Sequence, residues 1–356
     1  MKIKKIIKFY QIFFSTFSFS SIKLSEIIGE NVVKRQLPKN YKIKDAKYFL
    51  HEAVTKIPKT SLLEGEKLII TSEGILIKNS KIVKESFSGK KFDSKNYVSN
   101  LYWSKNIKKI NEKNIVSLFT VWSDNYYHWF TECIPKIILF STSHDVSKYV
   151  FIFPINHDKP FIKSTLKILD ISYQFFTENE FVVCDKIKFI TLTAPIGNFR
   201  PKIQRDLSDI LKNKISIENN TPKKKVYISR SNASKRFITN EKELLPILKK
   251  YNYQIVHLEK LSLEEQIKLI HDTYILIGLH GAGLTNMMFL QPQTKVIEIR
   301  LEGDIHMNLF YSLAQSLKVN YYYLLAKGDS KDIHECNIHV NVSEFEELLI
   351  NNEISV

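Results

Sequence analysis

Two short stretches of the chain hold histidines in settings suited to acid–base or anion-binding chemistry. The first is Asn125-Tyr-Tyr-His-Trp-Phe-Thr-Glu132, in which His128 precedes Glu132 by four residues. Residues four apart share one face of a helix, so the carboxylate could hold one ring nitrogen or accept a hydrogen bond from a bound hydroxyl. A histidine in the first helical turn feels the positive end of the helix dipole, which favours the neutral imidazole that a general base needs. The alternative is a capped, aromatic-rich helix whose histidine belongs to the core.

The second stretch is a glycine turn after an apolar run, Ile275-Leu-Ile-Gly-Leu-His-Gly-Ala-Gly-Leu-Thr-Asn286. A buried strand that enters such a turn and then a helix leaves backbone N–H groups free at the helix start, where an anion such as phosphate binds. Gly281 and Gly283 allow close approach of the backbone, and His280 could donate a hydrogen bond. His-Gly turns also occur in the cores of unrelated α/β proteins.

Arginine is scarce, which makes a close pair informative. Only six of the 52 basic residues are Arg, and Arg230 and Arg236 lie within Ser229-Arg-Ser-Asn-Ala-Ser-Lys-Arg236. A planar guanidinium at a strand end suits a phosphate, although a solvated basic loop would have the same composition. Glu298 follows near the end of a later strand, where a carboxylate could bind ribose or sugar hydroxyls or form an ordinary edge charge.

The sequence contains no recognisable set of ligands for a metal ion. His128 and Glu132 supply two ligands with no third nearby, the zincin pattern His-Glu-x-x-His is missing, and no Asp-x-Asp occurs. The three cysteines are widely spaced and form no CxxC pair, which favours a reducing compartment over a disulfide framework or a zinc site.

Length and composition indicate a globular protein of about two domains. The 356 residues are 44% hydrophobic and 25% charged, with a net charge of +15. That charge comes mostly from dispersed lysines without an Arg-rich block or a nucleic-acid-binding signature, so we expect no nucleic-acid partner. Peripheral attraction to an anionic membrane is the better expectation.

The N-terminus combines a basic start with an apolar run. Residues 1–8 are basic and residues 9–22 are uncharged and rich in Phe. This run is shorter than the roughly 20 residues that a membrane span needs. No small-residue cleavage site follows it, so a buried or interfacial segment is favoured over a secretory signal.

The rest of the chain alternates strands and helices, which indicates an α/β fold with parallel sheets. A hairpin is expected at 67–78. Further strands are expected at 115–121, 149–153, 181–192, 225–229, 253–258, 274–278, 295–299 and 319–325. The polar stretch 218–225 predicts a linker between an N-terminal domain, 1–217, and a C-terminal domain, 222–335. We expect the last helix, within 341–356, to pack back on the N-terminal domain.

Taken together, these stretches resemble glycosyltransferase family 61, whose bacterial branch is associated with capsular and other surface polysaccharides. The resemblance rests on Asn125–Pro135, on Ser229-Arg230 with Arg236 and Asn240-Glu241, and on His280–Asn286 with Val296-Ile-Glu298, in this order. It covers roughly residues 115–325. It implies a GT-B-like fold of two Rossmann-like domains facing a central cleft, and inverting, metal-independent transfer from a nucleotide sugar.

The resemblance also implies roles for individual residues. The donor or its phosphates would be bound by residues of the second half, namely Arg230, Arg236, His280, Gly281, Ala282, Gly283, Asn286 and Glu298. Asn125 and Trp129 would lie on the acceptor side. We predict His128 as the catalytic base, with Asp124 and Glu132 as rivals.

The predicted function is therefore that of a hexosyl- or pentosyltransferase acting in surface polysaccharide biosynthesis. It would use a nucleotide sugar as co-substrate and no further cofactor, and a saccharide or lipid-linked saccharide as acceptor. We expect it in the cytoplasm, peripheral at the inner face of the cell membrane. The alternatives are a catalytically silent carbohydrate- or nucleotide-binding protein on the same scaffold, and a zinc hydrolase that uses His128 and Glu132.

Overall fold

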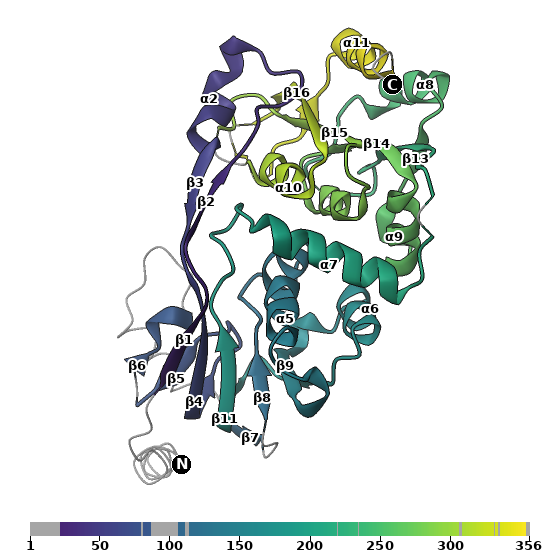
Figure 1. The fold of residues 1–356 in the computed structure, drawn as a ribbon. Coiled ribbons are helices and arrows are strands. Elements are labelled where there is room, and N and C mark those ends of the chain that lie inside the picture. Colours follow the sequence, from purple (N-terminus) through teal and green to yellow (C-terminus); the bar gives the residue numbers. More distant parts are fainter. Residues whose placement is uncertain are drawn as a thin grey trace. The chain divides into compact units, whose positions relative to one another are not determined.

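A computed structural model describes residues 22–79, 81–86, 106–110, 114–218, 220–233, 235–305, 308–330, 332–333 and 335–353. The apolar N-terminal run lies outside these ranges, apart from its last residue. Within them, no helix is long and apolar enough to cross a membrane. The chain divides into two compact units, Met1–Asn31 with Pro58–Thr193 and Val32–Ile57 with Ala194–Val356, called here the first and the second unit. Both combine helices with parallel strands, which confirms the mixed α/β class (Figure 1).

The first unit is built on a mixed sheet with the strand order β10-β9-β8-β11-β4-β5-β6. Its parallel part comprises β8 (Ile115–Ser117), β9 (Val150–Pro154), β10 (Tyr173–Phe176) and β11 (Glu180–Ile190), and β7 (Asn106–Ile110) also pairs with β11. Its antiparallel part comprises β1 (Lys23–Ile28), β4 (Thr60–Ile70), β5 (Leu76–Lys78) and β6 (Lys81–Ile82). The expected hairpin is confirmed, and Gly74 in its turn has a φ of 80°.

Helices of the first unit follow the parallel strands. They are α4 (Tyr126–His128), η4 (Trp129–Cys133), α5 (Ile134–Ser141) and α6 (Pro160–Ile168). The segment η4 is a π-helix that continues α4 and leads into α5. A π-helical segment within an α-helix replaces regular i→i−4 hydrogen bonds, and such segments are often found at functional sites.

The second unit contains a sheet with the strand order β13-β12-β14-β15-β16-β17. The strands are β12 (Lys224–Ile228), β13 (Gln254–Val256), β14 (Thr273–Leu279), β15 (Lys295–Leu301), β16 (Asn320–Gly328) and β17 (Ile338–His339), all parallel to their neighbours except β17. The helices are α7 (Pro201–Lys214), α8 (Glu241–Lys250), α9 (Leu263–His271), η8 (Ala282–Phe289), α10 (Leu309–Leu317) and α11 (Val342–Glu353). The first five strands therefore follow the doubly wound order 2-1-3-4-5, which reverses between β12 and β14.

The boundary predicted at residues 217–222 is wrong, because α7 belongs to the second unit. Arg205 of α7 donates to the Ser316 carbonyl (2.8 Å), and Ser208 donates to the Met288 carbonyl (2.5 Å). Residues 32–57 also belong to this unit. The guanidinium of Arg35 binds Thr55 (2.8 Å) and Asn198 (2.6 Å), which ties that early segment to the later chain.

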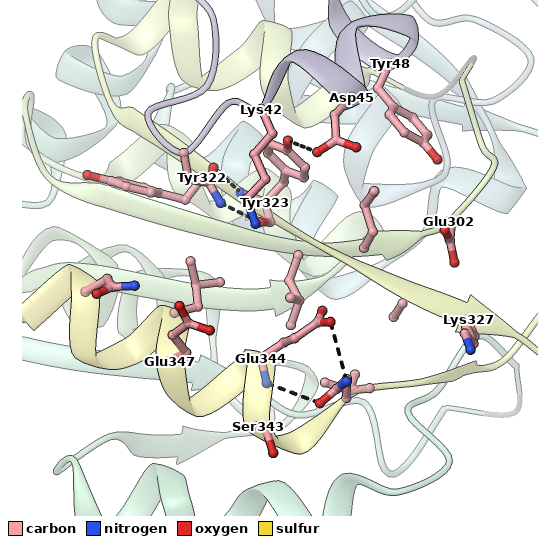
Figure 2. Close-up of a pocket in the computed structure, with 18 of the residues that line it drawn as sticks. Lys42, Asp45, Tyr48, Glu302, Tyr322, Tyr323, Lys327, Ser343, Glu344 and Glu347 are labelled. Carbon is pink, nitrogen blue, oxygen red and sulfur yellow. Dashed lines mark hydrogen bonds between the residues drawn. The ribbon is translucent and has the colours of Figure 1, made fainter.

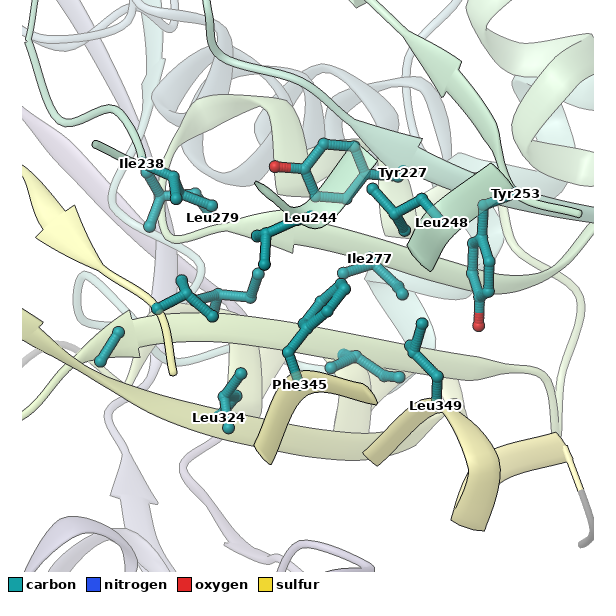
Figure 3. Packing of buried hydrophobic residues seen from close by; sticks show 14 of the residues in the cluster. Tyr227, Ile238, Leu244, Leu248, Tyr253, Ile277, Leu279, Leu324, Phe345 and Leu349 are labelled. Carbon is teal, nitrogen blue, oxygen red and sulfur yellow. The ribbon is translucent and has the colours of Figure 1, made fainter. Parts of the chain in front are cut away.

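The predicted position of the last helix is also wrong. Phe345 and Leu349 of α11 are fully buried in the core of the second unit, beside Leu244 and Leu248 of α8 (Figure 3). Full burial of such side chains contributes about 1.5–3 kcal/mol each. The apolar face of α11 therefore packs against the core of its own unit, and the sequence pattern alone did not specify this partner.

Candidate functional site

The His128 stretch follows a turn after β8, which ends at Ser117, and is fixed by a helix cap. Asn125 has extended backbone angles, and its side chain accepts a hydrogen bond from the Tyr127 N–H (2.9 Å). Asn125 therefore starts the helix, a role that short polar side chains commonly take. Its predicted place on the acceptor side remains a prediction.

His128 and Glu132 form the closest polar pair of this stretch. His128 Nδ1 lies 2.5 Å from Glu132 Oε1, and the second oxygen of Glu132 accepts from Thr120 Oγ1 (3.1 Å). The His128 side chain is 22% exposed and that of Glu132 only 6%. Because both oxygens of the carboxylate are occupied, Glu132 orients the imidazole and leaves Nε2 as the nitrogen open to a substrate. A carboxylate that fixes the tautomer in this way is typical of histidine bases.

Two other predicted residues of this stretch lie in different settings. Asp124 forms an ion pair with Lys159 (2.7 Å), so one carboxylate oxygen of this rival base is already occupied. Trp129 is fully buried and packs on Phe153, with ring centroids 5.5 Å apart. A direct contact of this side chain with an acceptor would require the core to open, and its predicted place on the acceptor side remains a prediction.

The sequence interpretation missed an exposed aromatic residue beside His128. Trp122 is 44% exposed, and its ring centroid lies 5.7 Å from that of His128. An exposed indole in contact with an open imidazole offers a flat apolar surface, which a sugar ring can cover. Its position just before the helix cap was the available signal.

Two buried titratable groups in or beside the helical segment that follows Ser123 were also missed. His157 Nε2 lies 2.9 Å from Ser123 Oγ, and burial lowers the pKa of His157 to about 4. Lys136, one helical turn after Glu132, is fully buried with Nζ 5.4 Å from the centroid of the Phe189 ring. Burial lowers the pKa of Lys136, whereas Cys133 and Glu132 act to raise it.

The second unit brings two predicted stretches together at the point where its strand order reverses. Arg230 follows β12, and His280 with Gly281 follows β14, the neighbouring strand. In open α/β sheets the crevice outside the carboxyl ends of such strands is the usual ligand site.

Gly281 and Arg230 touch at this point. Gly281 has a φ of 154°, and a Cβ placed on it would lie 2.7 Å from Arg230 Nη1. Arg230 also donates to the carbonyl groups of Arg236 (2.9 Å) and Lys235 (3.3 Å). Only glycine allows both this backbone conformation and this approach of the guanidinium to the turn.

The two arginines concentrate positive charge at the turn. Burial lowers the pKa of Arg230, and the nearby charge of Arg236 lowers it further, whereas Glu259 acts to raise it. Arg236 has a φ of 53°, an uncommon conformation for this residue type, and its buried Nε has no hydrogen-bond partner within the described part of the chain. Across the described ranges, neither guanidinium has a carboxylate oxygen within 4.0 Å. The cluster is therefore suited to an anion.

His280 belongs to a second histidine–glutamate pair. Its Nδ1 lies 2.5 Å from Glu298 Oε1, while Tyr321 donates its hydroxyl to the other oxygen of Glu298 (2.5 Å). Glu298 is fully buried, so its predicted direct contact with a donor would require the network to open. Burial acts to raise the pKa of Glu298, but His280, Arg300 and Tyr321 outweigh it and lower that pKa.

The remaining turn residues shape the backbone. Residues 282–289 form a 3-10 helix, in which Leu284 donates back to the Gly281 carbonyl (2.9 Å). The N–H groups of Ala282 and Gly283 precede the first helical bond, as at any helix start. Asn286 is buried and donates to the Gly283 carbonyl (3.1 Å), so it closes the turn from behind.

A separate polar groove of about 1280 Å³ lies in the second unit between residues 39–48, β16 and α11 (Figure 2). Exposed lysines of residues 39–47 line one wall, and Glu344 and Glu347 of α11 line the other. Tyr323 forms part of the groove and donates its hydroxyl to Asp45 (2.6 Å). Neither His280 nor Arg230 lines this groove, so it is not the turn described above.

Comparison with known proteins identifies the family of the central region. The model of the family described as Glycosyltransferase 61 matches residues 126–297. An EGF domain-specific O-linked N-acetylglucosamine transferase of Drosophila melanogaster is 36% identical over 123 residues, which cover 33% of this chain and 23% of that protein. The protein of the same name from Bos taurus is 39% identical over 74 residues, covering 19% of this chain and 14% of that protein.

The matched region contains both histidine–glutamate pairs except for the last residue, Glu298, together with the arginine pair and the glycine turn. The chain spans less than a third of the length of these curated relatives. On the family match, residues 126–297 of this chain are a glycosyltransferase family 61 domain.

Proposed function

We propose that this protein transfers a sugar from a nucleotide-sugar donor to an acceptor hydroxyl, with inversion and without a metal ion. The observation that carries the proposal is the arginine pair beside the Gly281 turn, at the reversal of the strand order. Among the described residues neither Arg230 nor Arg236 has a carboxylate oxygen within 4.0 Å, and Glu259 acts on Arg230 only from farther away, so a diphosphate would supply the close negative charge. The same cations would stabilise the charge that develops on the departing diphosphate.

In this proposal His128 acts on the acceptor. Its Nε2 takes the proton of the acceptor hydroxyl while the oxygen attacks the anomeric carbon and the bond from that carbon to the diphosphate breaks. Glu132 holds Nδ1 and stabilises the imidazolium that forms. The products are the glycoside, a nucleoside diphosphate and a proton on His128. The GT-B arrangement that the family resemblance implies is part of the proposal.

A transfer assay tests this proposal. Mass spectrometry and anomeric NMR of the product are followed with and without a chelator, for the wild type, His128→Ala and His144→Ala. His144 serves as the control because it lies on an exposed stretch, stacked on Phe140. We expect an inverted product that survives chelation and is lost only in His128→Ala. A strict requirement for a divalent cation, or a retained anomeric configuration, would refute the mechanism.

The sugar, acceptor and location are further parts of the proposal. The names of the relatives make nucleotide-linked N-acetylglucosamine the first donor to test. A saccharide or lipid-linked saccharide of surface polysaccharide biosynthesis is the acceptor that we propose, at the inner face of the cell membrane. The relatives' names instead suggest an EGF-domain polypeptide, so both acceptors belong in the assay. If a nucleotide sugar binds but neither hydrolysis nor transfer follows, the silent binding protein becomes the better account.

A further inference from the structure

The environment of His280 restricts what this side chain can do. Its backbone N–H donates to the Ile299 carbonyl (2.8 Å), and its ring meets Phe310 edge-on at 5.0 Å. The side chain is 13% exposed. The backbone is therefore held by Ile299 and the ring by Phe310 and Glu298, which leaves Nε2 as the nitrogen for a ligand.

The charge on Glu298 determines which ring nitrogen of His280 carries the proton. The pKa of Glu298 is lowered in spite of its burial, so the carboxylate is ionised and accepts hydrogen bonds only. It accepts one from His280 Nδ1–H and one from the Tyr321 hydroxyl. The neutral imidazole therefore presents a lone pair at Nε2, and Nε2 becomes a donor only when the ring carries a second proton.

We infer that Glu298 and Tyr321 are positioning residues, which hold His280 so that it binds the donor diphosphate through Nε2 as an imidazolium. The inference rests on the proposed function of the Gly281 turn. A neutral ring would point a lone pair at a phosphate oxygen, which is repulsive, whereas the imidazolium adds a charge-assisted hydrogen bond. Binding of the diphosphate then draws a proton onto His280.

The charged and titratable groups around His280 agree with this role. In the free protein the positive charge of Arg230, which is in contact with Gly281, opposes a positive charge on His280. On β15, Glu298 favours that charge, and Arg300 partly balances Glu298. The facing side chain of α10 is the apolar Phe310. An incoming diphosphate reverses the effect of Arg230 and favours the proton.

The expected consequence is pH-dependent binding that depends on His280. The dissociation constant of the nucleoside diphosphate should rise about tenfold or more as the pH increases through the range in which histidine loses its proton. Glu298→Gln removes the negative charge but keeps the size of the side chain, so it should weaken binding at neutral pH by about tenfold to hundredfold. In a His280→Asn background the same substitution should add little, because the two residues act as one unit.

Calorimetry with a nucleoside diphosphate at pH 8, in two buffers of different ionisation enthalpy, measures the protons taken up on binding. We expect uptake by the wild type that is lost in His280→Asn and reduced in Glu298→Gln. Equal uptake in the wild type and His280→Asn would overturn the inference. Tyr321→Phe, with the thermal midpoint of unfolding recorded, is the second variant in case Glu298→Gln fails to fold, and it should also reduce uptake.

Nitrogen-15 NMR of the histidine rings in the free protein separates this inference from the proposed function. We expect the His280 signal, assigned with His280→Asn, to carry its proton on Nδ1. A proton on Nε2 alone would overturn the inference whether or not the protein transfers sugar. If the ring is as expected but no nucleoside diphosphate binds, the proposed function fails instead.

Discussion

Replacing Gly281 by alanine tests the link between the glycine turn and the arginine pair. The φ of 154° lies in a region that is open almost only to glycine, so the added Cβ costs about 1–3 kcal/mol of strain. The same Cβ would lie 2.7 Å from Arg230 Nη1, so the guanidinium must move away from the turn. Loss of one charge-assisted hydrogen bond to a phosphate costs about 1.5–3 kcal/mol, which weakens binding about tenfold to hundredfold.

Gly303→Ala is the matched control. Gly303 also has a positive φ, 91°, but an added Cβ there has no atom within 4 Å. Both variants should therefore lower the thermal midpoint of the second unit, by about 2–4 °C for each kcal/mol lost. Only Gly281→Ala should weaken binding of a nucleoside diphosphate in a calorimetric titration. Equal affinities for the two variants would refute the reasoning that Gly281 gives Arg230 access to the phosphate.

Four further predictions concern the first unit. Trp129→Ala should cost about 3–5 kcal/mol of unfolding free energy in denaturant titrations, because the indole is fully buried. Trp122→Ala should leave that free energy within about 0.5 kcal/mol, yet lower kcat/KM for transfer about threefold to tenfold through lost contact beside His128; a large stability loss would contradict its exposed position. Glu132→Gln should reduce kcat about a hundredfold at unchanged donor affinity, since the carboxylate no longer stabilises protonated His128; unchanged kcat would exclude the pair from catalysis. Burial lowers the pKa of His157 to about 4, so as the pH falls the unfolded state takes up this proton before the folded state does. About 3 kcal/mol of unfolding free energy is therefore fully present above pH 6.5 and lost as the pH falls through 4. His157→Gln should flatten this pH dependence in unfolding experiments at several pH values.

The local pattern of the sequence was a good guide to the elements of the second unit. Alternating apolar runs and amphipathic stretches predicted β12 to β16 and α8 to α11 within a few residues, since central strands such as β14 and β15 are buried and helices such as α8 and α9 have one apolar face. The pattern carries no information on which unit an amphipathic helix covers. That is why α7 and α11 were placed with the wrong partner.

The candidate site shows the same division between local and non-local information. The four-residue spacing of His128 and Glu132 predicted a shared helix face, and the two side chains lie 2.5 Å apart. Nothing in the sequence linked Tyr321 to Glu298, because they meet through the pairing of β15 with β16. The burial of Trp129 is non-local in the same way, because all five residues of η4 lie in the core and nothing in their sequence showed this.

The central claim is that the second unit binds the diphosphate of a nucleotide sugar through the arginine pair at the Gly281 turn. Calorimetric titration of five common nucleoside diphosphates into the wild type, Arg230→Ala and His128→Ala tests it most directly. The account predicts that at least one of them binds the wild type at a single site, about tenfold to hundredfold more weakly to Arg230→Ala, and with nearly unchanged affinity to His128→Ala. Binding of none of them to the wild type, or equal weakening in both variants, would contradict it.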